Sequence, residues 1–480
     1  MDAMDAIVIR EGTDSRGTLC PRRLTLVQSP LVPISVICGI GFVLCSLLAQ
    51  LPSASFVSTA LLLLYLVAVL FCRPTFFIKY LQVVFAVVSD VVGCLSCEFS
   101  AGYLPELEVS GGFYGSAPLL IASRWCFIVV ILIYDSLFGV EKDGAMLASR
   151  TGDKAQGQGR GVLLFFNITF AAVATLVFLR ILPSPSFSLG LDKFQYARKY
   201  IYGIWATIDG RLGLFALIPL LGIRAGQYTI SLVGLGSYTA YLFWTGNKFG
   251  AFFSIACLIL FVFYDKLCGI GKARLVRIGA VLAIGILGLV AMTVSIMVVS
   301  KGIDPTEYLS DRTAQQGQLW WKVYGSYEPA HGLGELENEV DSLVKGNPDV
   351  ASNVGSKYGI YRIMYLSARA SLIDWKLGTG SRYTEAGFPA AYYYLGVPGV
   401  VLFALLGGIL TACVTNALIR ALCRGGILSS LLLYKLVNTV AMVISMFTFF
   451  QLFSRGCLVS YFLLFILARL QKGTHEYDWI

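Results

Sequence analysis

The stretch "FPAAYYYLGVPGVVLFALLGGILTACVTNAL", residues 388–418, contains no Asp, Glu, Lys or Arg. A helix of about 20 apolar residues is long enough to cross the hydrocarbon core of a bilayer. This stretch therefore predicts a membrane-spanning helix. It sets the fold class because runs like it recur along the chain.

The composition excludes a soluble globular protein. Of the 480 residues, 57% are hydrophobic and 14% are charged, and the mean hydropathy is +0.74. We predict an all-α polytopic membrane protein with about twelve transmembrane helices. The predicted spans are 31–51, 55–72, 77–97, 117–138, 161–182, 203–223, 226–244, 249–265, 278–299, 388–418, 427–453 and 457–470.

The basic residues orient these spans. Short cytoplasmic loops are enriched in Lys and Arg, and threading the chain places the loop 140–160 and the basic cluster 266–277 on one side. The tail 1–28 has four arginines and no apolar core, so we expect a cytoplasmic tail and not a cleaved signal. Arg73 and Lys79 are expected on the same side, and both termini are expected in the cytoplasm.

One extramembrane segment is large, and it divides the chain. We expect a cytoplasmic tail at 1–28, spans one to nine at 29–299, an external loop at 300–387, and the last three spans with a short tail at 388–480. A structureless loop of this length would be unusual, so the loop is expected to contain helix.

The end of this loop has the periodicity of an amphipathic helix. Ile363, Leu366, Ala370, Ile373 and Leu377 recur at spacings of three and four. Beside them, cations recur every seven residues at Arg362, Arg369 and Lys376, over about 21 Å of helix. One diphosphate could contact at most two of the three, and a purely solvated face is the alternative.

Further cations are expected at the same side of the membrane. Arg211, Lys248 and Arg455 lie near the external ends of predicted spans, where an ionisable group by default suggests a site facing a cavity. Residues 184–202 add Arg198 among the rings of Phe194, Tyr196, Tyr200 and Tyr202. That segment is either an interfacial belt with snorkelling cations or a platform for sugars and phosphate.

Metal and redox chemistry find little support in the sequence. There is no metal-spaced His/Cys set, no HExxH and no Walker A loop. Cys94 and Cys97 form a CxxC inside an apolar run, which favours core packing. No cofactor is predicted.

Several motifs stand in a suggestive order. The turn "TGNKFG" (245–250) opens a span, an arginine precedes "LGTG" (377–380), and "LGVPGVVLF" (395–403) follows. The pattern resembles the Wzy-type O-antigen polymerases and the related O-antigen ligases over roughly residues 240–420. The segment "DRTAQQGQLWW" (311–321) is also similar to one common in repeat-unit polymerases.

The resemblance implies a metal-independent membrane glycosyltransferase. It would transfer a glycan from undecaprenyl diphosphate onto a lipid-linked repeat unit at the periplasmic face of a bacterial inner membrane. Ligases usually have a histidine shortly after the GTG, and residues 381–396 contain none. Polymerase is therefore favoured over ligase, and a lipid-oligosaccharide flippase is the alternative from another class.

The implied site is rich in arginine because a lipid diphosphate must leave with its charge stabilised. The resemblance assigns Arg362 to the family's loop arginine, Gly378 and Gly380 to the GTG, and Lys248 to the basic residue of the turn. The catalytic candidates are Arg362, Arg369, Arg382 and, as the base, Glu385, with Asp209 as a second carboxylate. The candidates for substrate binding are Arg198, Arg211, Lys248, Arg312, Arg455, Gly378 and Gly380. The implied partners are undecaprenyl-diphosphate-linked oligosaccharides, membrane lipid and a chain-length regulator of the Wzz type, with no nucleic acid.

Overall fold

The computed structural model describes residues 30–99, 102–140, 159–191, 193–247, 249–270, 304–345, 357–378 and 381–473, with isolated positions between 274 and 295. The first half of the chain forms α1 (Leu31–Leu47), α2 (Pro52–Cys72), α3 (Pro74–Phe99), β1 (Tyr103–Leu104), β2 (Val109–Ser110), α4 (Ala117–Phe138), α6 (Gly159–Ile181), α7 (Lys193–Tyr200), α8 (Ile204–Phe215), α9 (Leu217–Arg224) and α10 (Tyr228–Trp244). The second half forms α11 (Phe249–Val262), α12 (Tyr264–Cys268), α14 (Pro305–Ser326), the 3₁₀ turn η4 (Leu333–Glu335), α15 (Leu336–Lys345), α16 (Gly359–Ser367), α17 (Ala370–Gly378), α18 (Gly387–Arg424), α19 (Ile427–Met446), the 3₁₀ turn η6 (Phe449–Phe453) and α20 (Arg455–Gly473).

The protein is an all-α membrane protein. Within the described residues, seven helical segments are long and apolar enough to cross a bilayer: α2, α3, α4, α6, the pair α8–α9, α18 and α19. α1 and α11 are apolar but shorter, and helices α10 and α20 occupy two further predicted spans. The predicted span 278–299 falls mostly outside the described residues, and the total of twelve stays a prediction.

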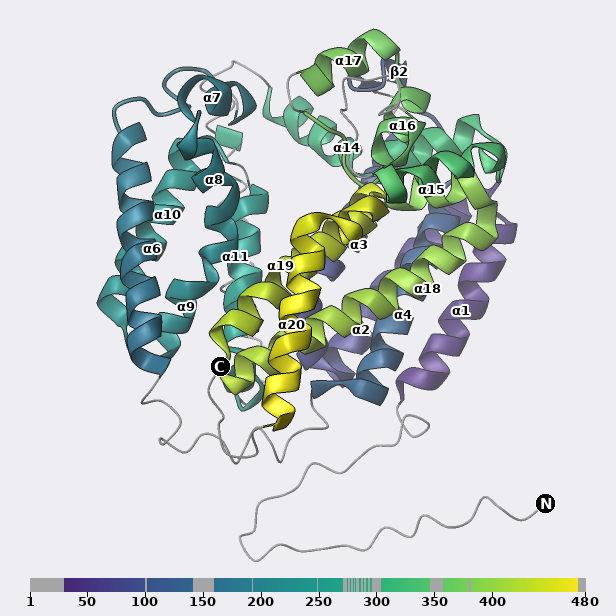
Figure 1. The fold of residues 1–480 in the computed structure, drawn as a ribbon. Coiled ribbons are helices and arrows are strands. Elements are labelled where there is room, and N and C mark those ends of the chain that lie inside the picture. Colours follow the sequence, from purple (N-terminus) through teal and green to yellow (C-terminus); the bar gives the residue numbers. More distant parts are fainter. Residues whose placement is uncertain are drawn as a thin grey trace, which may run out of the picture.

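The helices form two packed groups that share α18 (Figure 1). One apolar core joins α1–α4 with α14, α16 and the first half of α18. A second joins α6 and α8–α12 with the end of α18 and with α19. In Figure 1, α7 and α14–α17 gather at one end of these groups, and α1 begins at the opposite end.

Helix α14 is docked tightly on α3 by small residues. A Cβ on Gly317 would lie 2.0 Å from the backbone nitrogen of Cys94, so only glycine permits this crossing. The indole N–H of Trp320 donates to Ser116 O over 2.9 Å, and that of Trp321 donates to Gly112 O over 2.7 Å. The segment "DRTAQQGQLWW" therefore holds α14 against α3 and against residues 112–116.

The prediction of one continuous amphipathic helix through Arg362, Arg369 and Lys376 is wrong. Ala368 is extended, with φ −145° and ψ 170°, and separates α16 from α17. The helix ends there because Tyr327 OH donates to Leu366 O over 3.0 Å, which satisfies a carbonyl that the next turn would otherwise use. The three cations consequently have separate environments.

The orientation can be tested by cysteine labelling. We expect Glu337→Cys on α15 to react with a membrane-impermeant maleimide in intact cells, and Arg424→Cys at the end of α18 to react only after permeabilisation. Both side chains are exposed, and the difference follows from the charge asymmetry of the loops. The background would be cleared of native cysteines. Labelling of position 424 in intact cells would overturn the orientation.

Candidate functional site

Arg362 lies on α16, and two N–H groups on one edge of its guanidinium reach one carboxylate. Its Nε donates to Oε2 of Glu335 over 2.7 Å, and its Nη2 donates to Oε1 over 2.6 Å. Nη2 also lies 3.4 Å from the hydroxyl oxygen of Tyr393. The side chains of Arg362 and Glu335 are 28% and 34% exposed, so a ligand from solvent can reach the pair.

Tyr393 reaches Arg362 because α18 is interrupted just after it. Gly396 has φ 66° and ψ −152°, a conformation that favours glycine. Pro398, in the next turn, has no N–H to donate to Tyr394 O. At the break, the carbonyls of Tyr392 and Tyr393 accept from partners outside α18. The "LGVPG" motif therefore has a structural role here, namely to break the helix beside Arg362.

These two carbonyls anchor the segment that contains Glu335. Ala330 N donates to Tyr392 O over 3.2 Å, and Gly332 N donates to Tyr393 O over 2.8 Å. A Cβ on Gly332 would lie 2.1 Å from the Tyr393 ring, so glycine is required for this close approach. Two segments far apart in the sequence are thus fixed together where Arg362 meets its carboxylate.

Aromatic rings line the same place. Tyr327 lies 5.5 Å from His331 and 5.5 Å from Tyr393, and His331 lies 6.0 Å from Tyr393, all between ring centroids. We call Arg362, Glu335, Tyr393, Tyr327 and His331 the Arg362 cluster. It combines a partly exposed cation and carboxylate, an exposed imidazole, and two phenols of which Tyr393 is buried.

A second carboxylate lies one helical turn from Glu335. Glu339 on α15 is buried and accepts from the backbone N–H of Gly359, at the start of α16. Burial raises the pKa of Glu339 to about 7. Since it holds the first turn of α16, Glu339 positions the helix from which Arg362 projects.

The other two cations of the expected stripe point elsewhere. The side chain of Arg369 is 80% exposed, with its Nε 3.2 Å from Glu108. Lys376 is buried, and its Nζ donates to Glu106 over 2.6 Å. Arg362 alone of the three lies in the cluster defined above.

Arg382 contacts Tyr361, the residue before Arg362, and Gly378 of the LGTG motif contacts α7. The guanidinium carbon of Arg382 is 5.4 Å from the ring centroid of Tyr361, and its side chain is exposed. Gly378 O accepts a hydrogen bond from Arg198, so α7 and α17 come together. Gly380 and Lys248 lie outside the described residues.

Glu385, the expected base, is engaged in a different cluster. Its Oε2 accepts from Arg124 Nη2 over 3.0 Å, and Arg124 also pairs with Asp90. The guanidinium carbon of Arg124 lies 4.0 Å from the centroid of the Phe388 ring. Burial raises the pKa of Glu385, whose φ of +59° is unusual for a residue with a side chain. Glu385 therefore belongs to a buried triad with Asp90 and Arg124, apart from the contacts of Arg362.

The remaining candidates do not join the Arg362 cluster through any contact among the described residues. Arg211 is exposed on α8, and Arg455 is exposed as the first residue of α20. Arg312 Nη1 donates to Gln315 over 2.6 Å on its own helix. Asp209 accepts from Tyr241 OH over 2.7 Å.

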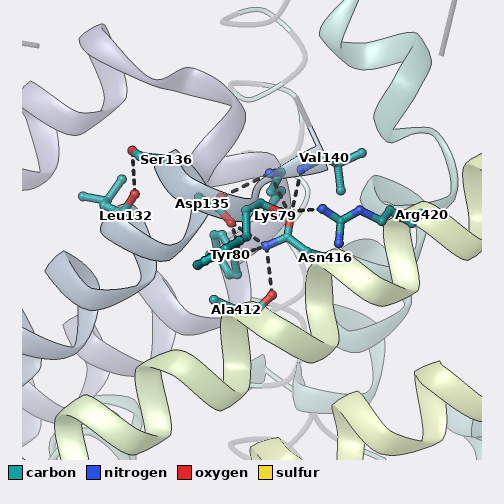
Figure 2. A network of polar contacts seen from close by, with 10 residues as sticks. Lys79, Tyr80, Leu132, Asp135, Ser136, Val140, Ala412, Asn416 and Arg420 are labelled. Atoms are coloured by element: carbon teal, nitrogen blue, oxygen red, sulfur yellow. Dashed lines mark hydrogen bonds and ion pairs between the residues drawn. The ribbon is translucent and has the colours of Figure 1, made fainter. Parts of the chain in front are cut away.

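A third polar cluster lies deep in the bundle (Figure 2). Lys79 Nζ donates to Asp135 Oδ2 over 3.1 Å and to Asn416 Oδ1 over 3.3 Å. Tyr80 OH donates to Asp135 Oδ1 over 2.8 Å, and Asn416 Nδ2 donates to the same oxygen. Lys79, predicted at the cytoplasmic end of the span 77–97, is buried. This network ties α3, α4 and α18 together, and its groups satisfy one another.

The sequence did not identify Glu335, His331, Tyr327 or Tyr393 as members of a site. The sequence marked this region only through Arg362 and the motif "LGVPG" (395–399), and nothing in the sequence connects them to residues 327–335. Within the described residues, no group of three or more His, Cys, Asp or Glu side chains could hold a metal ion.

Comparison with known proteins gives one match. A family of unknown function (DUF6418) matches residues 353–461, which include α16, α17, α18, α19 and the start of α20. The matched region contains Arg362 and Tyr393 but not Glu335. No curated protein and no solved structure matches the chain.

Proposed function

We propose that this protein is a polymerase of surface polysaccharides that transfers a glycan from undecaprenyl diphosphate to a lipid-linked repeat unit. The single observation that best supports the proposal is the partly exposed Arg362 with two N–H groups on one carboxylate. Two oxygens of a phosphate present the same acceptor geometry to a guanidinium. In this view, Glu335 occupies the place that the diphosphate takes when substrate binds.

The reaction then needs only an exchange of partners at Arg362. The bond between the anomeric carbon and the diphosphate oxygen breaks, and the diphosphate leaves with the bonding electrons, neutralised by the guanidinium. The acceptor hydroxyl oxygen forms the new glycosidic bond. Its proton passes to Glu335, which the diphosphate has released from Arg362. Glu335 replaces Glu385 as the proposed base, because Glu385 is paired with Arg124.

The rings of the cluster suit a sugar substrate. Tyr327 and His331 present aromatic surface beside the buried ring of Tyr393, and Tyr and His combine an apolar body with a polar tip. The acceptor sugar would lie against the rings of Tyr327 and His331 with its hydroxyl toward Glu335. The proposal places the cluster at the periplasmic face of the bacterial inner membrane, with both termini in the cytoplasm and a chain-length regulator as partner.

The surface polysaccharide of a deletion strain tests this function. Loss of a polymerase is expected to leave lipid A-core capped with a single repeat unit, whereas loss of a ligase or a flippase leaves uncapped core. The readout is the ladder of lipopolysaccharide bands after electrophoresis. Complementation with the wild-type chain serves as the control. Uncapped core in the deletion strain would contradict the polymerase assignment.

A further inference from the structure

An elongated cavity of about 610 Å³ lies between α1 and α4, on the side of the protein away from α6–α11 (Figure 1). Most residues that line it are apolar, and several of the aliphatic ones are more than half exposed, including Val36, Ile40 and Val43. Its volume lies in the range of about 300–1,000 Å³ typical of sites for small molecules. The cavity is therefore large enough for a defined ligand.

Aromatic rings and a glycine shape the floor of this groove. Trp125 lies against the backbone of α1 at Gly39, where a Cβ would be 2.8 Å from the indole ring. Tyr65 lies 6.2 Å from Trp125 between ring centroids, and its hydroxyl is 3.1 Å from Ser35 Oγ. These contacts fix the residues of the floor, so the shape of the groove is set by the packing of α1, α2 and α4.

One end of the groove is positively charged. Arg73 lines it, half-buried in the turn between α2 and α3. The neighbouring acid on α4, Asp135, is already paired with Lys79. Among the described residues Arg73 has no ion pair, so its charge is available to a ligand in the groove.

The length of the groove matches one leaflet of a bilayer. Its lining runs along α1 from Leu31 to Leu44, or about 20 Å at 1.5 Å per residue. One leaflet is about 15 Å thick in its hydrocarbon core and about 20–22 Å thick with its headgroup region. One acyl chain would therefore fill the groove with its headgroup at the level of Arg73.

We propose that this groove is a binding site for an anionic glycerophospholipid, with one acyl chain along α1 and α4 and the phosphate on Arg73. The site lies at the end of the bundle opposite α14–α17 and is separate from the Arg362 cluster. A lipid there would lie against both α1 and α4, which already pack on each other through Gly39, Phe42 and Trp125.

Native mass spectrometry of the purified full chain in detergent tests the proposal. The probes are dioleoyl phosphatidylglycerol and dioleoyl phosphatidylcholine, which share their chains and differ in net charge. We expect wild-type protein to bind the anionic lipid about fivefold more tightly, as for one basic residue near an anionic headgroup. Arg73→Ala should remove this preference, and Arg73→Lys should keep most of it.

Matched variants separate the groove from the general surface. Ile40→Trp fills the groove and should lower binding of both lipids at this site, whereas Leu64→Trp, on an exposed face of α2 outside the groove, should not. Arg424→Ala removes an exposed cation of α18 and should leave the preference unchanged. Val36→Trp fills the same groove if Ile40→Trp does not elute as folded protein.

Three results would overturn the proposal. Equal binding of the two lipids by the wild-type protein would mean that the groove does not distinguish headgroups by charge. An unchanged preference in Arg73→Ala would place the anionic lipid elsewhere. Unchanged binding in both groove-filled variants would show that the lipid does not occupy the groove.

Discussion

Replacing Arg362 with alanine is expected to abolish long glycan chains while the protein still inserts in the membrane. Loss of one well-placed donor to the transition state typically lowers the rate by about 10²–10³, or roughly 3–4 kcal/mol. The variant also leaves Glu335 without its partner, but that carboxylate is 34% exposed and water can solvate it. The measurement is in vitro extension of purified lipid-linked repeat units, normalised to folded enzyme.

Charge alone should not rescue the reaction. Arg362→Lys keeps the positive charge but loses the planar fork that contacts Glu335 twice, so we expect it to remain severely impaired. Arg369→Ala is the matched control because this arginine, seven residues on, is 80% exposed and makes one surface ion pair. Near-wild-type polymer from Arg362→Ala would remove the diphosphate role from this residue.

The sequence predicted the fold class and most span positions because hydrophobic length is a local property. It did not predict the break in α18 at Gly396, since an apolar run with one Gly-x-Pro reads as a continuous span. The break depends on tertiary partners: Ala330 and Gly332 use the carbonyls that the helix gives up. Such partners lie about sixty residues earlier in the chain, beyond the reach of a periodicity argument.

Only part of the candidate site was predicted, again because the rest depends on tertiary contacts. Arg362 was selected for its position before the LGTG, but its regular spacing to Arg369 and Lys376 suggested one helical face. Ala368 interrupts that face, and the hydrogen bond from Tyr327 that stabilises the break cannot be read from the spacing. The spacing of residues predicts a shared face only within one uninterrupted helix.

The partners of the buried charged residues were the least predictable feature of the structure. Lys79 lies in the predicted span 77–97 and Arg124 in the predicted span 117–138. The acids that pair with them come from other helices. A sequence shows that a charge is expensive in a membrane, but it does not show which acid neutralises it. Arg124 was not selected from the sequence, although it holds two carboxylates.

Replacing Arg124 with methionine is expected to destabilise the protein more than any surface change. Arg124 is 4% exposed and pairs with both Asp90 and Glu385. Removing one partner of a buried ion pair typically costs about 3–5 kcal/mol, because the remaining charge is left without compensation. Here two carboxylates would have to be protonated or hydrated. Thermal unfolding in detergent should show a large loss of stability.

Neutralising the acids in the same background separates charge from packing. In the triple variant Arg124→Met, Asp90→Asn and Glu385→Gln, no buried charge of the triad remains, so we expect much of the lost stability to return. Arg424→Met, at an exposed position of α18, should unfold like the wild type.

If Arg124→Met is as stable as wild type, the two carboxylates are already neutral without the arginine, and the triad does not stabilise the fold. If the triple variant stays as unstable as Arg124→Met, the loss comes from the packing of the guanidinium on Phe388 and not from charge.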